Sequence, residues 1–552
     1  MAKEQHKYIF VLGGVMSGVG KGVVTSSVGL LLEGKGYSVN LVKVDPYLNV
    51  DAGTMNPTEH GETFVLRSGL ETDQDMGNYE RFLGRDLTNE DYMTSGMVYR
   101  SVIDRERALE YGGKCVEAIP HVRDEILQRI LAAANHNRSR ISVIEIGGTI
   151  GDFQNELFIE AARVLKLHQP DDVLFVMVSY LPTPGTLGEM KTKPTQTAVR
   201  DLNSYGVQPD FIIARSKEPI DAKRKEKLAI WCNVHKDRII AAPDIKSIYD
   251  APLNFEKDKL SEALLLALKL SEKKKTSLTA WKKFAAAVKN TEAPEVRIAI
   301  VGKYFDTGDF VLSDAYLSVI EAIKFSAATL GLQPKIVWVN SKTIESGGAK
   351  ALATLTDYDG IIVPGGFGES GIEGKIKTIQ FAREHGIPYF GLCYGMQLMV
   401  VEYARNVLGL IDANTTEIKK NTTHPVVDVM LEQKKNIATN TYGGTMRLGA
   451  YPCLLKKGTI ARGAYKKEQI EERHRHRYEI NPAYIQQLEA AGLIFSGTSP
   501  DSVLMEITEL PRTVHPFMLG TQFHPELQAR PLSPHPLFTE FLKAAHSKRI
   551  KK

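Results

Sequence analysis

The stretch YIFVLGGVMSGVGKGVVTSSVGLLL, residues 8–32, passes from a short apolar run through a glycine-rich turn into a helix-prone segment. Apolar runs of the same kind recur along the first half of the chain. Segments with helical spacing, such as residues 125–137 and 156–168, lie between most of them. Continuous apolar strands that alternate with helices are typical of a parallel sheet covered on both faces. We therefore predict an α/β fold.

The chain of 552 residues is too long for a single core, so two or more domains are expected. The alternation stops near residue 255, a lysine-rich segment follows, and the pattern restarts with VRIAIVGKY at residues 296–304. We predict two domains, each a mostly parallel sheet flanked by helices, and a linker: residues 1–270, 295–552 and 271–294, respectively. Residues 45–110 interrupt the first half and read as a functional insertion.

Composition excludes several classes of protein. The formal net charge is only +4, which gives little support for a nucleic-acid partner. The four cysteines are scattered without paired spacing, so neither a disulfide scaffold nor a zinc site is expected. No apolar run reaches the roughly 20 residues that span a bilayer. We expect a cytoplasmic protein with no membrane partner.

The glycine-rich turn is predicted to bind phosphate. Backbone N–H groups at a helix start cradle phosphate oxygens, and Lys21 would reach the distal phosphates. The match to the G-x-x-x-x-G-K-[ST] pattern is partial, because Val15 and Gly22 replace the first glycine and the hydroxyl residue. Without that hydroxyl, Mg²⁺ needs carboxylates, and the candidates are Asp75 and Glu145. Asp73 competes with Asp75 for this role.

A second phosphate site is predicted at GEMKTKPTQ, residues 188–196. Two lysines flank a threonine there, and a proline opens the following helix, so donors gather at another helix start. Two phosphate sites in one domain indicate phosphoryl transfer between nucleotides.

The second half carries a candidate nucleophile, Cys393 in GLCYG, whose G-x-C-x-G spacing is that of a nucleophile elbow. The helix behind the cysteine would lower its pKa and favour the thiolate. In GTQFHPEL, His524 and Glu526 would share one face of an extended strand, so that Glu526 orients His524 and His524 activates Cys393. Gly366 and Phe367 in VPGGFGES could form an oxyanion hole.

These motifs together resemble a known family. PGGFG, GLCYGMQ and QFHPE resemble class I glutamine amidotransferase domains. The first half resembles the P-loop-like synthetase (amidoligase) domain of the CTP synthase family, through GGVMSGVGKG, KVDPYLNVDAGTMNPTEHGE, ETDQDMGNYERF, EIGGTIGD and KTKPTQ. The resemblance spans nearly the whole chain, with both halves in the family order.

The resemblance implies an ATP-dependent ligase of pyrimidine biosynthesis. ATP would phosphorylate O4 of UTP with Mg²⁺ as cofactor, and ammonia from glutamine hydrolysis would replace the phosphate to give CTP. Ammonia would pass between the sites through an internal channel. The family also implies GTP as allosteric activator, CTP as feedback inhibitor, a homotetramer, and in some members filaments.

Site residues carry over by motif. ATP would be held by Gly18, Val19, Gly20, Lys21, Gly22, Val23 and Asp75, with adenine near Pro243, Asp244 and Ile245. UTP or CTP would be held by Ser17, Asp152, Phe153, Gln154, Lys191, Thr192, Lys193, Pro194, Thr195, Gln196 and Lys227. Glutamine would be held by Gly366, Tyr394, Gly395, Met396, Gln397, Glu417 and Arg477, and Mg²⁺ by Asp75 and Glu145.

Two departures affect regulation. The family more often has an acid in place of Gln154, which puts CTP readout in doubt, and an arginine in place of Ser370, which puts the strength of GTP activation in doubt. Two alternatives stay open at this point. One is a ligase of the cobyrinic acid amide-forming type, and the other is a regulatory ATPase of the partition-protein class with an inactive glutaminase domain.

Overall fold

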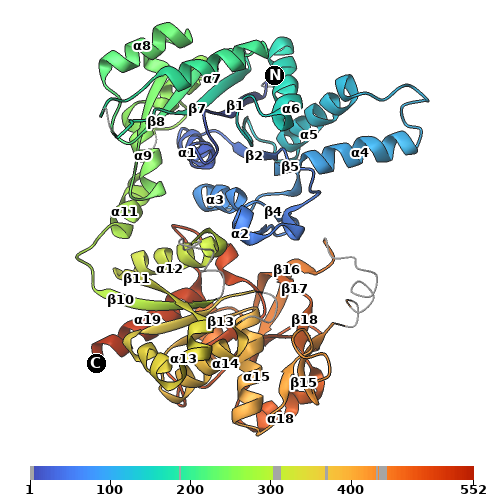
Figure 1. Cartoon of the computed structure of the whole chain (residues 1–552), viewed down its shortest axis with the longest axis vertical. Helices are drawn as coiled ribbons and strands as arrows, with labels where there is room; N and C mark the ends of the chain where they lie inside the picture. The colour runs from blue at the N-terminus through green and yellow to red at the C-terminus, as the bar shows by residue number, and fades with distance from the viewer. Residues whose placement is uncertain are drawn as a thin grey trace. The chain divides into compact units, whose positions relative to one another are not determined.

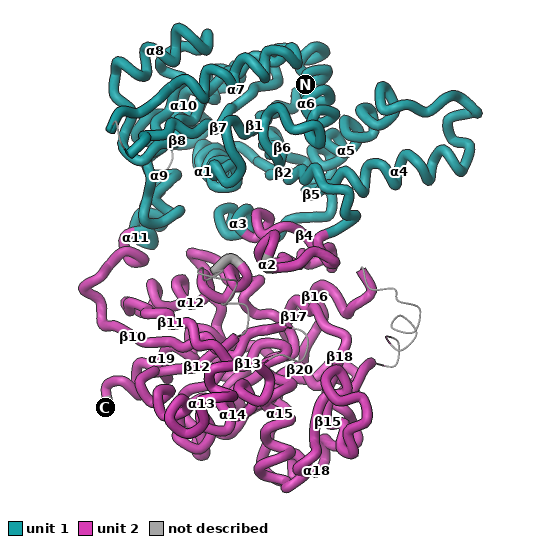
Figure 2. The backbone as a smooth tube through the Cα atoms, in the orientation of Figure 1, with its two compact units in different colours: residues 1–51, 78–285 teal, residues 52–77, 286–552 magenta. Residues whose placement is uncertain are grey.

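The computed structural model describes residues 5–185, 188–275, 277–302, 313–366, 371–430, 433 and 444–551. The chain forms two compact units, each made from two separate parts of the sequence (Figure 2). Unit 1 comprises Met1–Asp51 and Asn78–Ala285, and unit 2 comprises Ala52–Gly77 and Ala286–Lys552. Among the described residues, no helix combines the length and apolar character needed to cross a membrane.

Unit 1 is built on a seven-stranded sheet in which every neighbouring pair is parallel, as predicted. The strands, in spatial order, are β5 (Tyr92–Thr94), β2 (Val39–Asp45), β6 (Ile141–Ile146), β1 (Lys7–Gly14), β7 (Val173–Tyr180), β8 (Phe211–Ser216) and β9 (Ile239–Pro243). The main helices are α1 (Lys21–Gly34), α4 (Ser95–Arg107), α5 (Arg123–His136), α6 (Glu156–His168), α7 (Lys193–Ser204), α8 (Ala222–Cys232), α9 (Ala251–Lys257) and α10 (Leu260–Ala267) (Figure 1).

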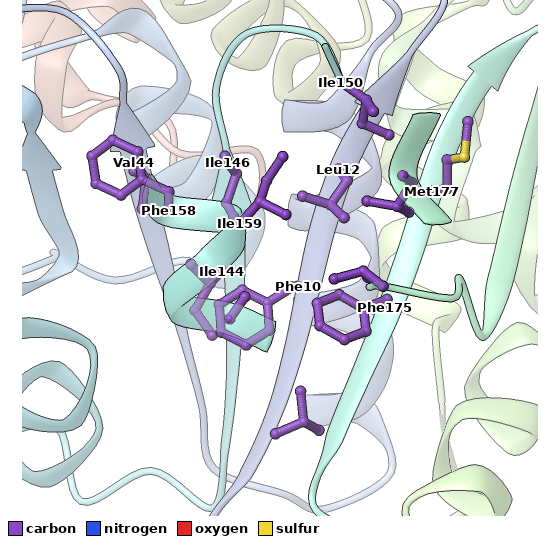
Figure 3. Packing of buried hydrophobic residues seen from close by; sticks show 14 of the residues in the cluster. Phe10, Leu12, Val44, Ile144, Ile146, Ile150, Phe158, Ile159, Phe175 and Met177 are labelled. Carbon is purple, nitrogen blue, oxygen red and sulfur yellow. The ribbon is translucent and has the colours of Figure 1, made fainter. Parts of the chain in front are cut away.

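The core of unit 1 fixes the carboxyl ends of its central strands. Phe10 of β1 stacks on Phe175 of β7 with ring centroids 5.7 Å apart, and α6 packs Phe158 and Ile159 over the same face (Figure 3). These four side chains are 3% exposed or less. Burial of such side chains contributes roughly 1.5–3 kcal/mol each. The loops that follow β1, β6 and β7 therefore start from rigid strand ends.

Unit 2 is built on a nine-stranded mixed sheet. Its first five strands are parallel, namely β11 (Gln333–Asn340), β10 (Glu295–Gly302), β12 (Gly360–Val363), β13 (Tyr389–Leu392) and β21 (Met518–Thr521). Four strands continue the sheet in antiparallel pairing, namely β20 (Met505–Glu509), β19 (Ile494–Thr498), β16 (Arg447–Leu455) and β17 (Gln469–His476). β10, β11, β12 and β13 match predicted apolar runs, whereas β21 and the antiparallel extension were not among the predicted strands.

Helices and a smaller sheet complete unit 2. The small sheet contains β14 (Ala413–Thr415), β15 (His424–Val429) and β18 (Tyr478–Ile480). The helices are α12 (Leu317–Leu330), α13 (Ser341–Ala353), α14 (Ile372–Glu384), α15 (Tyr394–Asn406), α17 (Ile460–Tyr465), α18 (Ile485–Ala490) and α19 (Pro536–Lys551) (Figure 1).

The predicted linker, residues 271–294, contains an ordered helix. It is α11 (Thr279–Val288), whose Trp281 is 3% exposed and donates its indole N–H to the Tyr249 carbonyl at 2.8 Å. Phe82 and Phe284 pack around the same indole. Apolar side chains on one face of this lysine-rich helix thus attach the first part of the linker to unit 1.

The predicted insertion divides between the two units. Residues 52–77 form α2 (Pro57–His60) and a small ribbon of β3 (Phe64–Val65) and β4 (Glu71–Thr72), and this segment belongs to unit 2 (Figure 2). Arg473 of β17 donates to the Val65 carbonyl at 3.0 Å, and Arg475 donates to Glu71 at 2.7 Å. The backbone of Gly449 in β16 lies against Gly69. We call residues 52–77 the docked segment.

A glycine substitution tests this docking. Gly449 has φ of +91°, and an added Cβ would lie 2.6 Å from the Gly69 nitrogen. Gly458 has φ of +83° with no atom within 4 Å of the added Cβ. Both alanine variants pay about 1 kcal/mol of backbone strain. We expect Gly449→Ala to lose about 2 kcal/mol more of the free energy of unfolding, measured by denaturant titration. Equal losses would contradict the docked position of the segment.

Candidate active sites of the two units

Cys393 lies on a sharp turn between β13 and α15, as the elbow prediction required. Its φ of 49° and ψ of −96° are strained for a residue with a side chain. The flanking glycines are needed for close approach. A Cβ on Gly395 would lie 2.1 Å from the Val363 carbonyl oxygen, and one on Gly391 would lie 2.7 Å from the Gly395 carbonyl carbon. The G-x-C-x-G spacing thus reflects backbone packing as well as turn geometry.

The Cys393 sulfur lies among polar groups. The residue is 6% exposed, and its N–H donates to the Thr521 carbonyl at 2.6 Å. The Gln522 side chain donates to Sγ at 3.6 Å, and the Arg475 carbonyl lies 3.9 Å from Sγ. This environment differs from that of an inert core cysteine such as Cys453, where burial raises the pKa of the thiol well above its usual value.

His524 and Glu526 meet as predicted, but not on a strand. Strand β21 ends at Thr521, and Pro525–Gln528 form a 3₁₀ turn, η10, that starts after His524. This turn brings His524 Nδ1 within 2.7 Å of Glu526 Oε1. The strand interpretation was therefore wrong in its geometry, because the proline ends the sheet pairing and the tight turn replaces the same-face spacing.

The charge of His524 is set by opposing effects. Burial lowers the pKa, whereas the Glu526 carboxylate and the Cys393 sulfur raise it, and the result is a pKa of about 10. The imidazole is thus protonated at neutral pH. A cation beside the sulfur is the arrangement that stabilises a thiolate.

A cavity of about 90 Å³ adjoins these side chains. Cys393, His524 and Glu526 line it together with Gly365, Gly366 and three residues of the docked segment, Pro57, Glu62 and Thr63. Gly365 packs directly against the His524 ring, since a Cβ there would lie 2.9 Å from Cε1. The predicted oxyanion donor Gly366 therefore borders the cavity, whereas Phe367 and Ser370 lie outside the described residues.

The residues predicted to hold glutamine occupy several elements. Tyr394, Gly395, Met396 and Gln397 open α15 and are buried, and Gln397 donates to the Tyr478 carbonyl at 2.9 Å. Arg477 follows β17 and donates to Gln433 and Thr445, both at 2.8 Å. Glu417 lies in a turn after β14, where its N–H donates to Thr415 Oγ1 at 3.2 Å. Gln397 and the buried part of α15 position the elbow, and Arg477 is the half-buried cation in this set.

The phosphate loop of unit 1 joins β1 to α1. Val15 takes a positive φ of 79°, so the position where the usual pattern has glycine keeps a glycine-like backbone. Gly18 and Gly20 also have positive φ, and among the described residues no side chain caps α1. Lys21 is 8% exposed and donates to the Gly148 carbonyl at 2.7 Å. Ser17 and Gly18 are exposed at the tip, and Val19, Gly22 and Val23 form the base.

The residues predicted near adenine share a cavity with this loop. A cavity of about 150 Å³ is lined by Gly20 and Val23 and by Pro243 and Ile245. Asp244 is exposed at its edge and pairs with Arg215 at 3.1 Å. The phosphate loop and the end of β9 thus line one cavity.

The second predicted phosphate site opens α7. Thr192 is the N-cap residue, and Pro194 lies in the first turn. Thr195 is buried with its hydroxyl 2.7 Å from Ser179, and Gln196 donates to Thr192 at 3.1 Å. The buried side chains of Thr192, Thr195 and Gln196 therefore support the loop through hydrogen bonds inside the protein.

The lysines of this region point outward. Lys191 pairs with Glu189 at 2.6 Å, and Lys193 is exposed. The pKa of the Glu189 carboxyl is lowered by Lys191, by Arg224 and by Lys227 of α8. Lys191 and Lys227, together with Arg224, thus lie around the Glu189 carboxylate.

Asp152, Phe153 and Gln154 lie on an exposed turn. Asp152 accepts from the Thr149 N–H at 2.7 Å, and Phe153 is 85% exposed. Phe153 and Gln154 border an apolar groove of about 910 Å³ that Leu48 and Ile103 also line.

The predicted metal ligands differ in their surroundings. Glu145, at the carboxyl end of β6, is 1% exposed and accepts from Lys43 at 2.9 Å and from the Tyr79 hydroxyl. Asp73 accepts from the Asp75 N–H at 2.8 Å at the start of helix α3 (Gln74–Leu83). Asp75 and Glu145 belong to different units. Within the described residues no three His, Cys, Asp or Glu side chains form a metal cluster. Mg²⁺ binds through one or two protein carboxylates, with phosphate oxygens and water as further ligands, and the assignment of Asp75 and Glu145 as its ligands stays a prediction.

Three contributors were missed from the sequence. Gln522 touches the Cys393 sulfur, the docked segment lines the cavity at Cys393, and Arg215 lines the cavity beside the phosphate loop. Arg215 could have been found, because it lies at the carboxyl end of a predicted parallel strand, where ligands bind. The docked segment carried no local signal for its partner.

A phosphate-loop unit and a cysteine-elbow unit in one chain define the class of glutamine-dependent ligases. The comparisons with known proteins agree with this class. Residues 7–270 match the family described as CTP synthase N-terminus, and residues 311–544 match the family described as Glutamine amidotransferase class-I.

The similarity to known proteins extends over nearly the whole chain. A CTP synthase of Caldanaerobacter subterraneus subsp. tengcongensis is 47% identical over 99% of both chains, and one of Pyrococcus furiosus is 48% identical over 98% of both. A solved Trypanosoma brucei CTPS glutaminase domain with bound acivicin is 39% identical, covering 46% of this chain and 94% of its own, with a TM-score of 0.42. The chain belongs to the CTP synthase family. It is a ligase that uses ATP and glutamine to aminate UTP to CTP, which decides against both alternatives.

The charge of His524 generates a prediction. In Glu526→Gln, burial outweighs the remaining attraction, so the pKa of His524 should fall from about 10. We expect glutamine hydrolysis at neutral pH to slow at least tenfold and Cys393 alkylation by iodoacetamide to slow with it. Ammonia-dependent CTP formation should stay unchanged. Glu489→Gln, on a partly exposed side chain, is the matched control. If the pH dependence of Cys393 alkylation is the same in Glu526→Gln as in the unchanged protein, this account of the His524 charge is refuted.

Proposed function

We propose that Cys393, His524 and Glu526 hydrolyse glutamine and that unit 1 uses the ammonia to aminate UTP through a 4-phosphorylated intermediate. The observation that carries the first part is the strained elbow, which holds Cys393 beside a protonated His524 that Glu526 orients. The residues 295–552 would act as glutaminase domain, residues 1–270 as synthetase domain, and residues 271–294 as their connection.

Glutamine hydrolysis follows from this geometry. The Cys393 sulfur attacks the side-chain amide carbon of glutamine, and His524 gives its proton to the departing ammonia. Water then cleaves the thioester, releases glutamate and restores the sulfur. Backbone N–H groups of the PGG turn, including Gly366, would bind the oxyanion. Glu417 and Arg477 suit the α-amino and α-carboxylate groups of glutamine.

Phosphorylation in unit 1 is proposed to activate the pyrimidine. Lys21 and the N–H groups from Gly18 to Val23 would hold the ATP phosphates, and the cavity at Pro243 and Ile245 would take adenine. Mg²⁺, held by Asp75, Glu145 and phosphate oxygens, would neutralise charge on the transferred group. Phosphorylation of O4 makes a leaving group, and ammonia attacks C4 to give CTP and phosphate.

The pyrimidine nucleotide is assigned to the loop before α7. Lys191, Lys193 and Lys227 supply positive charge there, and Ser17 lies at the tip of the phosphate loop. Asp152, Phe153 and Gln154 are proposed to read CTP as feedback inhibitor. GTP is proposed as allosteric activator from resemblance to the family alone.

Two variants and two nitrogen sources test this division of labour. CTP formation is followed by ultraviolet absorbance with ATP, Mg²⁺ and UTP, first with glutamine and then with ammonium chloride. Cys393→Ala should lose glutamine-dependent synthesis at least 100-fold and keep ammonia-dependent synthesis. Lys21→Ala should lose both at least 100-fold, because phosphorylation precedes either nitrogen source. Loss of ammonia-dependent synthesis in Cys393→Ala would reject separate sites.

A homotetramer is proposed for the working enzyme, as in the family. The apolar groove supports it, since Leu48 is 74% and Ile103 56% exposed around Phe153, and such patches mark interaction surfaces. Ile103→Glu should weaken assembly, whereas Leu266→Glu, 78% exposed on α10, should not. Light scattering with ATP and UTP present measures the mass. A tetramer of unchanged stability in Ile103→Glu would exclude this groove as the interface.

A further inference from the structure

A buried carboxyl group lies directly behind the proposed catalytic turn. Glu472 of β17 is 3% exposed, and three side chains of unit 2 converge on it. The Tyr465 hydroxyl lies 2.7 Å from Oε1, His535 Nε2 lies 3.0 Å from Oε1, and Gln528 Nε2 lies 2.5 Å from Oε2. Tyr465 ends α17, and His535 directly precedes α19. The proposed mechanism uses none of these four residues.

The hydrogen-bond directions around Glu472 are mutually consistent. His535 Nδ1 accepts from the Leu537 N–H at 3.3 Å, so Nε2 carries the ring proton and donates to Glu472. Removal from water and the neighbouring Glu472 raise the pKa of Tyr465 well above its usual value, so its hydroxyl stays a donor. Three donors thus face one acceptor group, which is what a buried carboxylate requires.

Gln528 connects this cluster to the catalytic turn. It is the last residue of η10, the turn that carries Glu526, and it also donates to the Glu471 carbonyl at 2.9 Å. At the other end of the turn, the His524 N–H donates to the Arg473 carbonyl at 2.8 Å. Consecutive residues of β17 therefore hold both ends of η10, and Glu526 lies between these two attachments.

We propose that Glu472 is a positioning residue for glutamine hydrolysis, acting through Gln528 to hold Glu526 against His524. The inference rests on the proposed roles of Cys393, His524 and Glu526. Glu472 touches no reacting atom, because Gln528 and the turn lie between it and the histidine. Small misplacements of a catalytic group can cost as much as 100-fold in rate, so a fixed turn matters to the reaction.

The substitution Glu472→Gln tests the link. It keeps the shape of the side chain but replaces one of the two acceptor oxygens with a donor, so that either Gln528 or the pair Tyr465 and His535 loses its acceptor. We expect kcat for glutamine hydrolysis to fall about tenfold, with KM for glutamine within twofold. Ammonia-dependent CTP formation should be unchanged. Alkylation of Cys393 at neutral pH, measured in a Cys115→Ser background because Cys115 is exposed, should slow in parallel.

Gln528 offers the reciprocal test. Gln528→Glu places two carboxylates against each other and should also lose about tenfold in kcat. The double variant Glu472→Gln with Gln528→Glu restores a donor–acceptor pair and should recover at least threefold over either single variant. Gln528→Ala, on a partly exposed side chain, gives a milder variant that should fold and lose about fivefold. Glu468→Gln, whose side chain is 86% exposed just before β17, is the matched control.

The outcomes separate this inference from the proposed function. Single variants whose glutaminase kcat stays within twofold of the unchanged protein would overturn the positioning role. A parallel loss of ammonia-dependent synthesis would also overturn it, because the effect would then be general destabilisation. Cys393→Ala is measured beside them. If that variant still hydrolyses glutamine, the proposed catalytic residues themselves are wrong.

Discussion

The alternation of side chains along β17 is the constraint on which unit 2 depends. Successive residues of a strand point to opposite faces, so the arginines and the histidines of RHRH separate completely. Arg473 and Arg475 reach the docked segment through Val65 and Glu71. His474 and His476 face the body of the unit, 2.9 Å from each other. The Arg473 carbonyl accepts from the His524 N–H, and the Arg475 carbonyl lies 3.9 Å from the Cys393 sulfur. One strand therefore contacts both the proposed catalytic residues and the docked segment.

The same region shows how surroundings decide the charge of a histidine. Burial, with Arg447 nearby, lowers the pKa of His474 and His476 well below the usual value, so both are neutral. His524 is also buried, yet Glu526 and Cys393 bring its pKa to about 10. Neutral neighbours leave His524 as the single cation among these three rings. His474 and His476 also have carboxyl groups nearby, Glu506 and Glu479, but Arg447 pairs with both of these groups. The Glu526 carboxylate, in contrast, pairs with His524 itself.

Local sequence patterns predicted much of the fold and of the candidate site. The apolar runs that became β1, β6, β7 and β13 identified the sheets, since strand formation and burial are read from a few adjacent residues. The elbow at Cys393 and its meeting with His524 and Glu526 followed from short motifs. The features that the sequence did not predict depend on contacts between distant parts of the chain. The 3₁₀ turn after His524, the positive φ of Val15 and the buried face of α11 depend on tertiary packing, which overrides local spacing. The docking of residues 52–77 depends on contacts such as Arg473 to Val65, which are 408 positions apart.

That separation in sequence affects how the chain folds during its synthesis. The docked segment leaves the ribosome early, but the strand that receives it is made 408 residues later. At roughly 5–20 residues per second, the interval is on the order of tens of seconds. During this time Arg473 and Arg475 do not yet exist to meet Val65 and Glu71. The docked segment therefore cannot take its place in unit 2 until synthesis of the chain is nearly finished. A gene divided at the connecting helix would yield a glutaminase half without part of its own cavity wall.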